Sequence, residues 1–258
     1  MRQPIKSKGL VLMGIAWLLL SCSKRDNPSQ EAQLANMTSQ LCNNLRGVQA
    51  MYWDMNNGVL RGDIPGGVPT IKNPGAYFIH SGYPALGFQM PQGYRAIELS
   101  GSNTIGVNVL RNDDNALWRY VTTTFFGITN ADQVLQVELN QMLANLGNPQ
   151  NVTIVCSNAG GSQLAPDMQS TTATALVRAG NFTAILAVNV NVLASTGSSF
   201  IGIQMTLGPT AEYDRLVLDA FLPIGYQLLF INRERVQDSD NDGVPDDRDR
   251  APFNPNIQ

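Results

Sequence analysis

Residues 188–207 read VNVNVLASTGSSFIGIQMTL and carry the strongest structural signal in the chain. Val188, Val190 and Val192 alternate with Asn189 and Asn191, and after the turn signal Ser-Thr-Gly-Ser at 195–198 the apolar alternation resumes at 201, 203, 205 and 207. Successive side chains of a strand point to opposite faces, so this segment has one apolar and one polar face. The pattern predicts an antiparallel hairpin that lies over a core.

Other segments of the chain also have strand character. Alternating apolar residues, β-branched residues and turn signals predict the strands Tyr94–Leu99, Ile105–Leu110 and Leu117–Phe125, with a turn at Asn112–Asn115. Further along, the predicted elements are a short buried strand Val152–Cys156, a loop Asn158–Gln169 and a last strand Tyr226–Ile231. The alternation in Arg215–Phe221 is ambiguous.

Two segments have the spacing of amphipathic helices. The apolar face of the first, which stops at Gly58, consists of Leu34, Met37, Leu41, Leu45, Val48 and Tyr52. The second begins at a cap, Thr129 or Asn130, and ends at Gly147 and Pro149. Together these elements predict an α+β fold, mainly an antiparallel sheet with two amphipathic helices packed on it.

The segment Gly58–Gly93 is rich in residues that interrupt regular structure. Thirteen of its 36 residues are Gly or Pro, which predicts a long irregular connection. Long loops are often functional, and this one offers a possible binding loop with the candidate anchors Tyr77, Phe78, His80, Tyr83 and Phe88. The alternative is a packed loop whose aromatic residues cover one end of the core.

The N-terminus has the build of a secretory signal. Arg2, Lys6 and Lys8 precede an apolar run from 10 to 20, and no acidic residue occurs before Asp26. The run is shorter than the roughly 20 residues that a membrane-spanning helix needs, which disfavours a retained anchor. The sequence Leu19-Leu20-Ser21-Cys22 resembles the lipobox of bacterial lipoproteins. The resemblance implies a signal peptide at 1–21, a lipid attached to Cys22, and an anchor in the bacterial cell envelope, in the outer membrane rather than the inner.

Two cysteines remain outside this motif, Cys42 and Cys156. In an oxidising envelope compartment they can form a disulfide bond. Two buried free thiols are the alternative, because cysteine packs as a small apolar residue.

Close to the C-terminus, residues 238–249 read DSDNDGVPDDRD. Alternate oxygen ligands on a tightly turning loop with a central glycine suit Ca²⁺, which takes six to eight oxygens at about 2.3–2.6 Å. The predicted ligands are Asp238, Asp240, Asp242, the carbonyl of Val244, Asp246 and Asp249. The loop and its proline-containing exit at 250–255 resemble a thrombospondin type 3 repeat, although Ala251 stands where many members have cysteine. The alternative is an acidic tail without a metal.

These segments divide the chain into four parts. They are the signal peptide 1–21, the lipidated cysteine and tether 22–33, the α+β globular domain 34–236 and a short calcium-loop tail 237–258. Three of the 17 Lys and Arg residues and none of the 20 acidic residues precede Cys22, which leaves 14 basic against 20 acidic residues, a net charge of −6. Such a balance argues against nucleic-acid binding.

The sequence contains no strong catalytic motif. There is one histidine, and no Gly-x-Ser-x-Gly elbow, phosphate loop or dinucleotide fingerprint is present. The preferred function is therefore a non-enzymatic lipoprotein that binds or scaffolds. Its partner would be a protein or a glycan in the envelope, which the Asn-, Ser- and Thr-rich strand faces would contact through hydrogen bonds. A carboxylate-based hydrolase is the alternative, with the candidates Glu98, Glu138, Asp167, Glu212 and Asp214.

Overall fold

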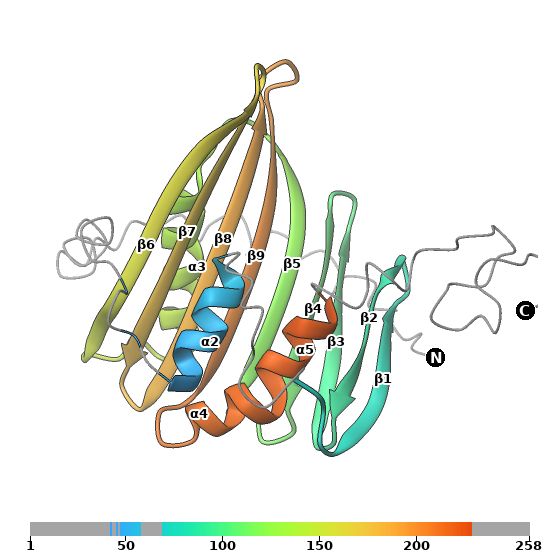
Figure 1. Cartoon of the computed structure of the whole chain (residues 1–258), viewed down its shortest axis with the longest axis vertical. Coiled ribbons are helices and arrows are strands. Elements are labelled where there is room, and N and C mark those ends of the chain that lie inside the picture. The colour runs from blue at the N-terminus through green and yellow to red at the C-terminus, as the bar shows by residue number, and fades with distance from the viewer. Residues whose placement is uncertain (1–41, 43–44, 46, 58–68, 229–258) are drawn as a thin grey trace, which may run out of the picture.

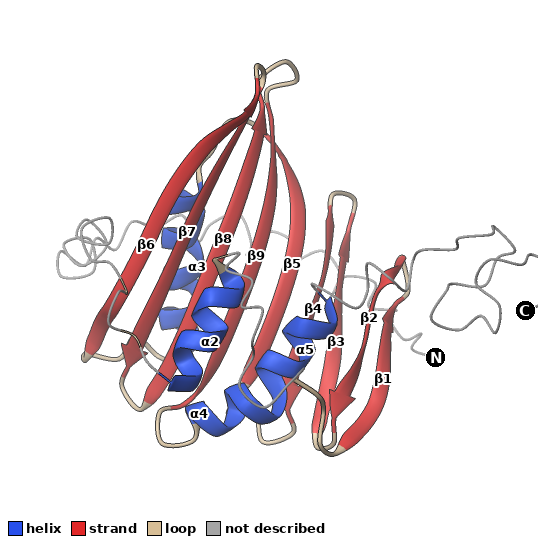
Figure 2. Ribbon diagram, viewed as in Figure 1, coloured by secondary structure: helices blue, strands red, loops and turns tan. Residues whose placement is uncertain are grey.

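The structure is a computed structural model that describes residues 42, 45, 47–57 and 69–228 (Figure 1). A seven-stranded antiparallel sheet forms its centre, with the spatial order β3-β4-β5-β9-β8-β7-β6. Its strands are β3 (Tyr94–Gly101), β4 (Thr104–Arg111), β5 (Leu117–Phe126), β6 (Val152–Ala165), β7 (Met168–Ala179), β8 (Phe182–Leu193) and β9 (Ser198–Pro209). Helices cover both faces of this sheet, so the predicted α+β class is confirmed (Figure 2).

The hairpin predicted at 188–207 forms the middle of the sheet. β8 and β9 pair in register from Leu193 with Ser198 at the turn to Phe182 with Pro209 at the far end. The valines at 188, 190 and 192 are buried on one face, while Asn189 and Asn191 lie on the opposite face and are only half-buried. The local alternation therefore predicted both the pairing and the two faces of these strands.

Helix α3 (Ala131–Asn145) packs on the face that carries those valines. Its residues Leu135, Leu139, Met142 and Leu143 share one core cluster with Leu186 and the other inward residues of β7, β8 and β9. Asn130 is the cap, because its side chain accepts a hydrogen bond from the Gln133 amide at 2.9 Å. The helix ends at Asn145. Gly147, just after it, has the left-handed φ of 77° that glycine adopts without strain.

The other face of the sheet is covered only over part of its length. Helix α2 (Gly47–Asn56) and a C-terminal helical run lie against it, the run consisting of α4 (Tyr213–Leu216), η2 (Val217–Phe221) and α5 (Leu222–Tyr226) (Figure 1). Tyr52 and Trp53 of α2 pack in a second core cluster with Trp118, Val217 and Phe221. Of the predicted face of the first helix, Tyr52 is buried and Leu45 and Val48 are partly buried; Leu34, Met37 and Leu41 lie outside the described residues.

Two predictions about loops are wrong. Asn158–Gln169 is not a loop, because β6 continues to Ala165 and pairs with β7 through almost its whole length. Residues 74–91 are not irregular either, since β1 (Pro74–His80) and β2 (Tyr83–Pro91) form an antiparallel hairpin beside β3. Prolines are tolerated there because the pair forms its own two-stranded sheet with register shifts, where a missing ladder hydrogen bond is accommodated.

The last predicted strand is also wrong in the part that the structure describes. Tyr226 ends α5, and residues 227 and 228 are helical, while 229–231 lie outside the described residues. The ambiguous segment Arg215–Phe221 belongs to the same helical run. Leu216, Val217, Ala220 and Phe221 are buried there, and this spacing of one, three and one residues fits one side of a helix.

Candidate functional site

A polar groove of about 950 Å³ is open on the sheet face opposite α3, beyond the end of α2. Side chains from six neighbouring strands and from the last turn of α2 line it. Most of the lining residues are of a type with a hydroxyl or an amide side chain: Asn56, Asn57, Ser100, Ser102, Asn103, Thr104, Thr122, Thr123, Thr124, Thr172, Thr174, Asn189, Asn191 and Gln204. None of the described residues in the lining is Asp, Glu, Lys or Arg.

The strand register explains why these residues meet. Cross-strand partners point to the same face of a sheet, and one continuous row of partners crosses the groove floor. We call it the central row: Ser100, Ile105, Thr122, Gly202, Asn189 and Thr172, one residue from each of β3, β4, β5, β9, β8 and β7. Neighbouring rows add Tyr120, Gln204 and Thr174 on one side and Thr124, Phe200 and Asn191 on the other.

Hydrogen bonds between side chains hold parts of the floor and wall in place. The Asn191 side-chain amide donates to the Oδ1 atom of Asn189 at 2.9 Å, and the Asn189 side-chain amide donates to the Ser170 hydroxyl at 3.2 Å. At the end of α2, the Asn57 amide oxygen accepts from Thr174 at 3.1 Å and from Asn158 at 3.3 Å. The helix end is thereby tied to β6 and β7, and it forms one wall of the groove.

The centre of the floor is left open by a glycine. A Cβ atom added to Gly202 would approach only the Asn189 carbonyl oxygen, at 4.0 Å, so the site could hold a side chain and does not. Two residues along β9 from it, the Oε1 atom of Gln204 is buried and has no hydrogen-bond partner among the described residues. A buried acceptor without a donor is destabilising by about 1–3 kcal/mol.

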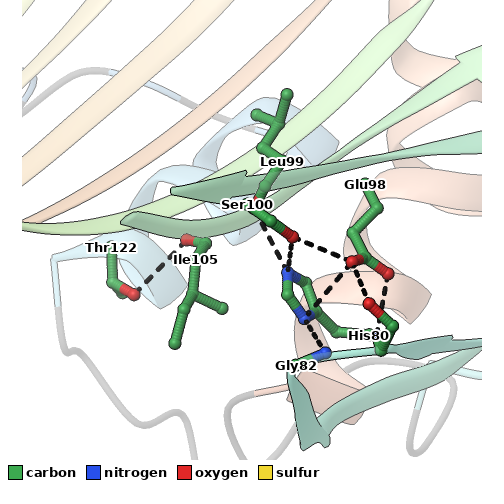
Figure 3. A network of polar contacts seen from close by, with 8 residues as sticks. His80, Gly82, Glu98, Leu99, Ser100, Ile105 and Thr122 are labelled. Atoms are coloured by element: carbon green, nitrogen blue, oxygen red, sulfur yellow. Dashed lines mark hydrogen bonds and ion pairs between the residues drawn. The ribbon is translucent and has the colours of Figure 1, made fainter. Parts of the chain in front are cut away.

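His80 is among the residues that line the groove, and a network of polar contacts holds its ring (Figure 3). Its side chain is 1% exposed. The Nδ1 atom accepts a hydrogen bond from the Gly82 amide at 3.1 Å, and Nε2 lies 3.2 Å from the Leu99 carbonyl oxygen, to which it donates. These two contacts fix the neutral tautomer with the hydrogen on Nε2.

Glu98 and Ser100 surround this ring in an arrangement that outwardly matches a serine–histidine–acid triad. The Ser100 hydroxyl lies 3.5 Å from Nε2, and a Glu98 oxygen lies 3.8 Å from Nδ1. A triad needs a hydrogen on Nδ1 and a free lone pair on Nε2, and the contacts of Gly82 and Leu99 impose the reverse. Ser100 instead donates to Glu98 at 2.9 Å. The geometry is that of a structural network which joins the β1–β2 hairpin to β3.

The hydrogen bonds that Glu98 accepts favour its ionised form. Ser81 donates to it through both its hydroxyl and its backbone amide, the latter at 2.8 Å, and Ser100 adds a third donor. These donors stabilise the carboxylate and lower the pKa of Glu98 to about 2. Glu98 therefore serves as an acceptor and not as an acid at neutral pH.

The other hydrolase candidates do not gather in the groove, and each has a partner elsewhere. Glu138 on α3 lies 3.7 Å from Arg119, Asp167 accepts from Ser195 at 3.0 Å, and Glu212 pairs with Arg111 at 2.8 Å. Asp214 accepts from Gln49 at 2.7 Å. The lining that the structure describes includes none of the five carboxylates.

The predicted aromatic anchors divide into two groups. Phe88 and His80 are buried, and Phe88 packs against Trp118 with the ring centroids 5.5 Å apart. Phe78 is partly buried in the same cluster. Tyr77 and Tyr83 are 39% and 50% exposed, and Tyr83 is close enough to Tyr120 in the groove to help raise the pKa of that phenol, after desolvation by burial.

Sequence reasoning missed most of the groove. It identified polar strand faces and the asparagines at 189 and 191, but it did not single out Thr122, Thr172 or Gln204. Alternation reveals that a strand has a polar face; it does not reveal which strands lie side by side.

Cys42 and Cys156 are joined by a disulfide bond in the structure, with their Cα atoms 5.2 Å apart. That separation lies in the usual range for such bonds. Cys156 is on β6 in the second core cluster, so the bond connects the segment before α2 to the sheet.

The lipobox cysteine Cys22 and the calcium loop 238–249 lie outside the described residues. Among the residues that the structure does describe, no group of three or more His, Cys, Asp or Glu side chains could hold a metal ion. Within the same part of the chain, none of the helices has the length and apolar character to cross a membrane.

Comparisons with known proteins give distant structural likenesses and no match by sequence. No protein-family model matches the chain, and no curated protein matches it by sequence. Among solved structures, a point mutant of protein Mog1 is similar with 9% identity and a TM-score of 0.28, over 62% of this chain and 91% of that one. The Ran-binding protein Mog1p of Saccharomyces cerevisiae is similar with 9% identity and a TM-score of 0.29, over 62% of this chain and 90% of that one.

Proposed function

We propose that this chain is a non-enzymatic binding or scaffolding lipoprotein, held at a membrane of the bacterial envelope by a lipid on Cys22. The ligand site is the polar groove, and the calcium loop at 238–249 has a structural role at the end of the chain. The proposal joins the lipobox at 19–22 with the chemistry of the groove.

One observation supports a binding role above the others. The groove of about 950 Å³ is large enough for a ligand of substantial size, and most of the residues that line it are Ser, Thr, Asn or Gln. Such groups form hydrogen bonds, and they are poor nucleophiles without a neighbouring general base. The one imidazole at the groove has both ring nitrogens engaged by backbone groups.

A hydrolase that uses two carboxylates is the weaker candidate. It requires two carboxyl groups about 5–9.5 Å apart on either side of the bond to be cut. Of its five candidates, Glu98 accepts a hydrogen bond from the lining residue Ser100, and its ionised state with three donors makes it unsuited to donate a proton.

Binding through the groove is tested by capture from detergent-solubilised envelope. The lipidated chain is the bait, and it is compared with Gly202→Leu, which fills the centre of the floor, and Gly202→Ala, which adds one methyl group. We expect wild type and Gly202→Ala to retain a partner that Gly202→Leu loses, with equal results whether or not calcium is chelated. Equal capture by all three proteins would contradict a role for the groove.

The membrane anchor has its own test. Cys22→Ala removes the sulfur that would carry the lipid, so the variant should move from the membrane to the soluble fraction. Mass spectrometry of the wild type should find acyl chains on Cys22. A variant that still sediments with membranes, together with an unmodified wild type, would disprove the lipoprotein assignment.

A further inference from the structure

We propose that the groove takes an uncharged glycan chain, which lies across the strands along the central row. This inference rests on the proposed function, because it names the class of ligand for the same groove. It follows from the charge, the shape and the aromatic content of the lining.

The lining selects against charged ligands. No described lining residue is Asp, Glu, Lys or Arg, and His80 is held as the neutral tautomer. A phosphate, carboxylate or ammonium group would give up hydration there without gaining an ion pair. Hydroxyl and amide side chains both donate and accept hydrogen bonds, as sugar hydroxyls and acetamido groups do.

The shape selects an extended ligand. The central row crosses six adjacent strands, which at the usual spacing of about 4.8 Å gives a length of roughly 24 Å. The missing side chain at Gly202 deepens its middle. A track of this length fits several linked sugar units better than a single small molecule.

The floor offers little to a peptide strand. β4, β5, β9, β8 and β7 are each paired on both sides, so their backbone groups are already used within the sheet. Peptides that bind by strand addition need a free sheet edge. In this groove a ligand meets side chains only, and its polar groups must be satisfied by hydroxyls and amides.

Aromatic rings stand along the track where sugar rings could pack. Tyr120 is in the floor, stacked on Trp118 with an interplanar angle of 15°. Phe200, 43% exposed, is in the lining beyond the central row. Aromatic side chains supply rigid apolar area with a polar tip in the case of tyrosine, which suits the alternating C–H faces and hydroxyl rims of sugar rings.

Calorimetry with neutral hexasaccharides of glucose, mannose, galactose and N-acetylglucosamine tests the inference, with a hexamer of galacturonate as the charged comparison. The lipidated chain in detergent micelles should bind at least one neutral hexamer and not the galacturonate. Since no charged side chain takes part, affinity should change less than about twofold between low and high salt. Gly202→Leu should abolish binding, while Gly202→Ala retains it.

Asn189→Ala removes hydrogen bonds from the floor and should weaken binding by roughly tenfold. Asn145→Ala on α3 is the matched control, because this exposed residue lies outside the groove lining, and it should bind as the wild type does. The melting temperature of each variant is measured as well. A melting temperature near that of the wild type shows that a loss of binding is not caused by misfolding.

The outcomes separate this inference from the function on which it rests. Binding of a neutral hexamer that Gly202→Leu loses supports both. If no neutral hexamer binds, or the galacturonate binds better, the glycan inference is overturned. In that case, the capture experiment decides whether the groove binds anything. If the wild type captures an envelope component that Gly202→Leu loses, the groove is still a binding site. If both proteins capture the same components, both proposals are wrong.

Discussion

The indole Nε1 of Trp118 donates a hydrogen bond to the hydroxyl of Tyr52 across 3.1 Å, and both side chains are buried. The bond joins α2 to β5. Burial raises the pKa of Tyr52 well above its ordinary value, so the phenol remains neutral and available as an acceptor.

Tyr52→Phe should destabilise the fold, since it leaves the Trp118 N–H buried without an acceptor. We expect the free energy of unfolding to fall by about 1–3 kcal/mol, measured by urea denaturation. Tyr83→Phe is the matched control, because half of that side chain is exposed, and it should change stability by less than about 0.5 kcal/mol. Equal effects from the two substitutions would show that the buried hydrogen bond is unimportant.

Glu98 should make stability depend on acid pH. Its pKa in the folded protein is about 2, lowered first by the hydrogen bonds from Ser81, while an unfolded glutamate titrates near 4.3. A lowered folded pKa stabilises the fold above the unfolded value, and this contribution is lost as the pH falls from about 4.3 to about 2. Melting temperatures measured between pH 7 and pH 2 should show it.

Glu98→Gln is the variant to compare. It should melt below the wild type at pH 6, and the difference should shrink as the pH approaches 2, because the wild-type carboxylate is then protonated. A constant gap between wild type and Glu98→Gln at every pH would contradict the assignment.

The bond between Cys42 and Cys156 should be present in protein purified without reductant. It closes a loop over a sequence separation of 114 residues, and its removal should lower the free energy of unfolding by about 2–4 kcal/mol. Non-reducing peptide mapping should find the linked peptides, and the double variant Cys42→Ser with Cys156→Ser should no longer respond to reductant. Two thiols that alkylate freely in unreduced protein would refute the bond.

The calcium loop stays a prediction for residues that the structure does not describe. Five inward carboxylates repel one another without a cation, so calcium should protect residues 238–258 from proteolysis, with half-saturation at about 10⁻⁴–10⁻³ M. Asp240→Ala combined with Asp242→Ala should leave the tail cleavable even with calcium present. Asp247→Ala, at a position not predicted to bind, should behave as wild type does. Absence of a calcium heat in the wild type by calorimetry would count against the site.

Several elements could be predicted because their signals are local. The alternation of 188–207 defines the β8–β9 hairpin and its two faces, and Asn130 with Gln133 defines the start of α3. Each depends on residues that are neighbours in the sequence and act through backbone geometry alone. The α+β class follows from the same local patterns.

Other elements depend on their partners. Gly160 and Gly161 have low strand propensity by themselves, yet they are part of β6 because β7 pairs with them residue by residue. Pro74, Pro84 and Pro91 likewise occur in a hairpin that composition alone would call irregular. In the C-terminal run, apolar residues that resemble a strand are helical because they pack against α2 and the sheet.

By itself, the amino-acid sequence determined the polar and apolar faces of the central hairpin and the type of most other elements, since these follow from the period of side chains along one segment. Only the tertiary structure decided that Ser100, Thr122, Gly202, Asn189 and Thr172 share one groove. Their meeting depends on the order and register of six strands from distant parts of the chain. A shift of one residue in any pairing would turn that strand's polar side chains to the opposite face, so long-range pairing, and not local pattern, creates the site.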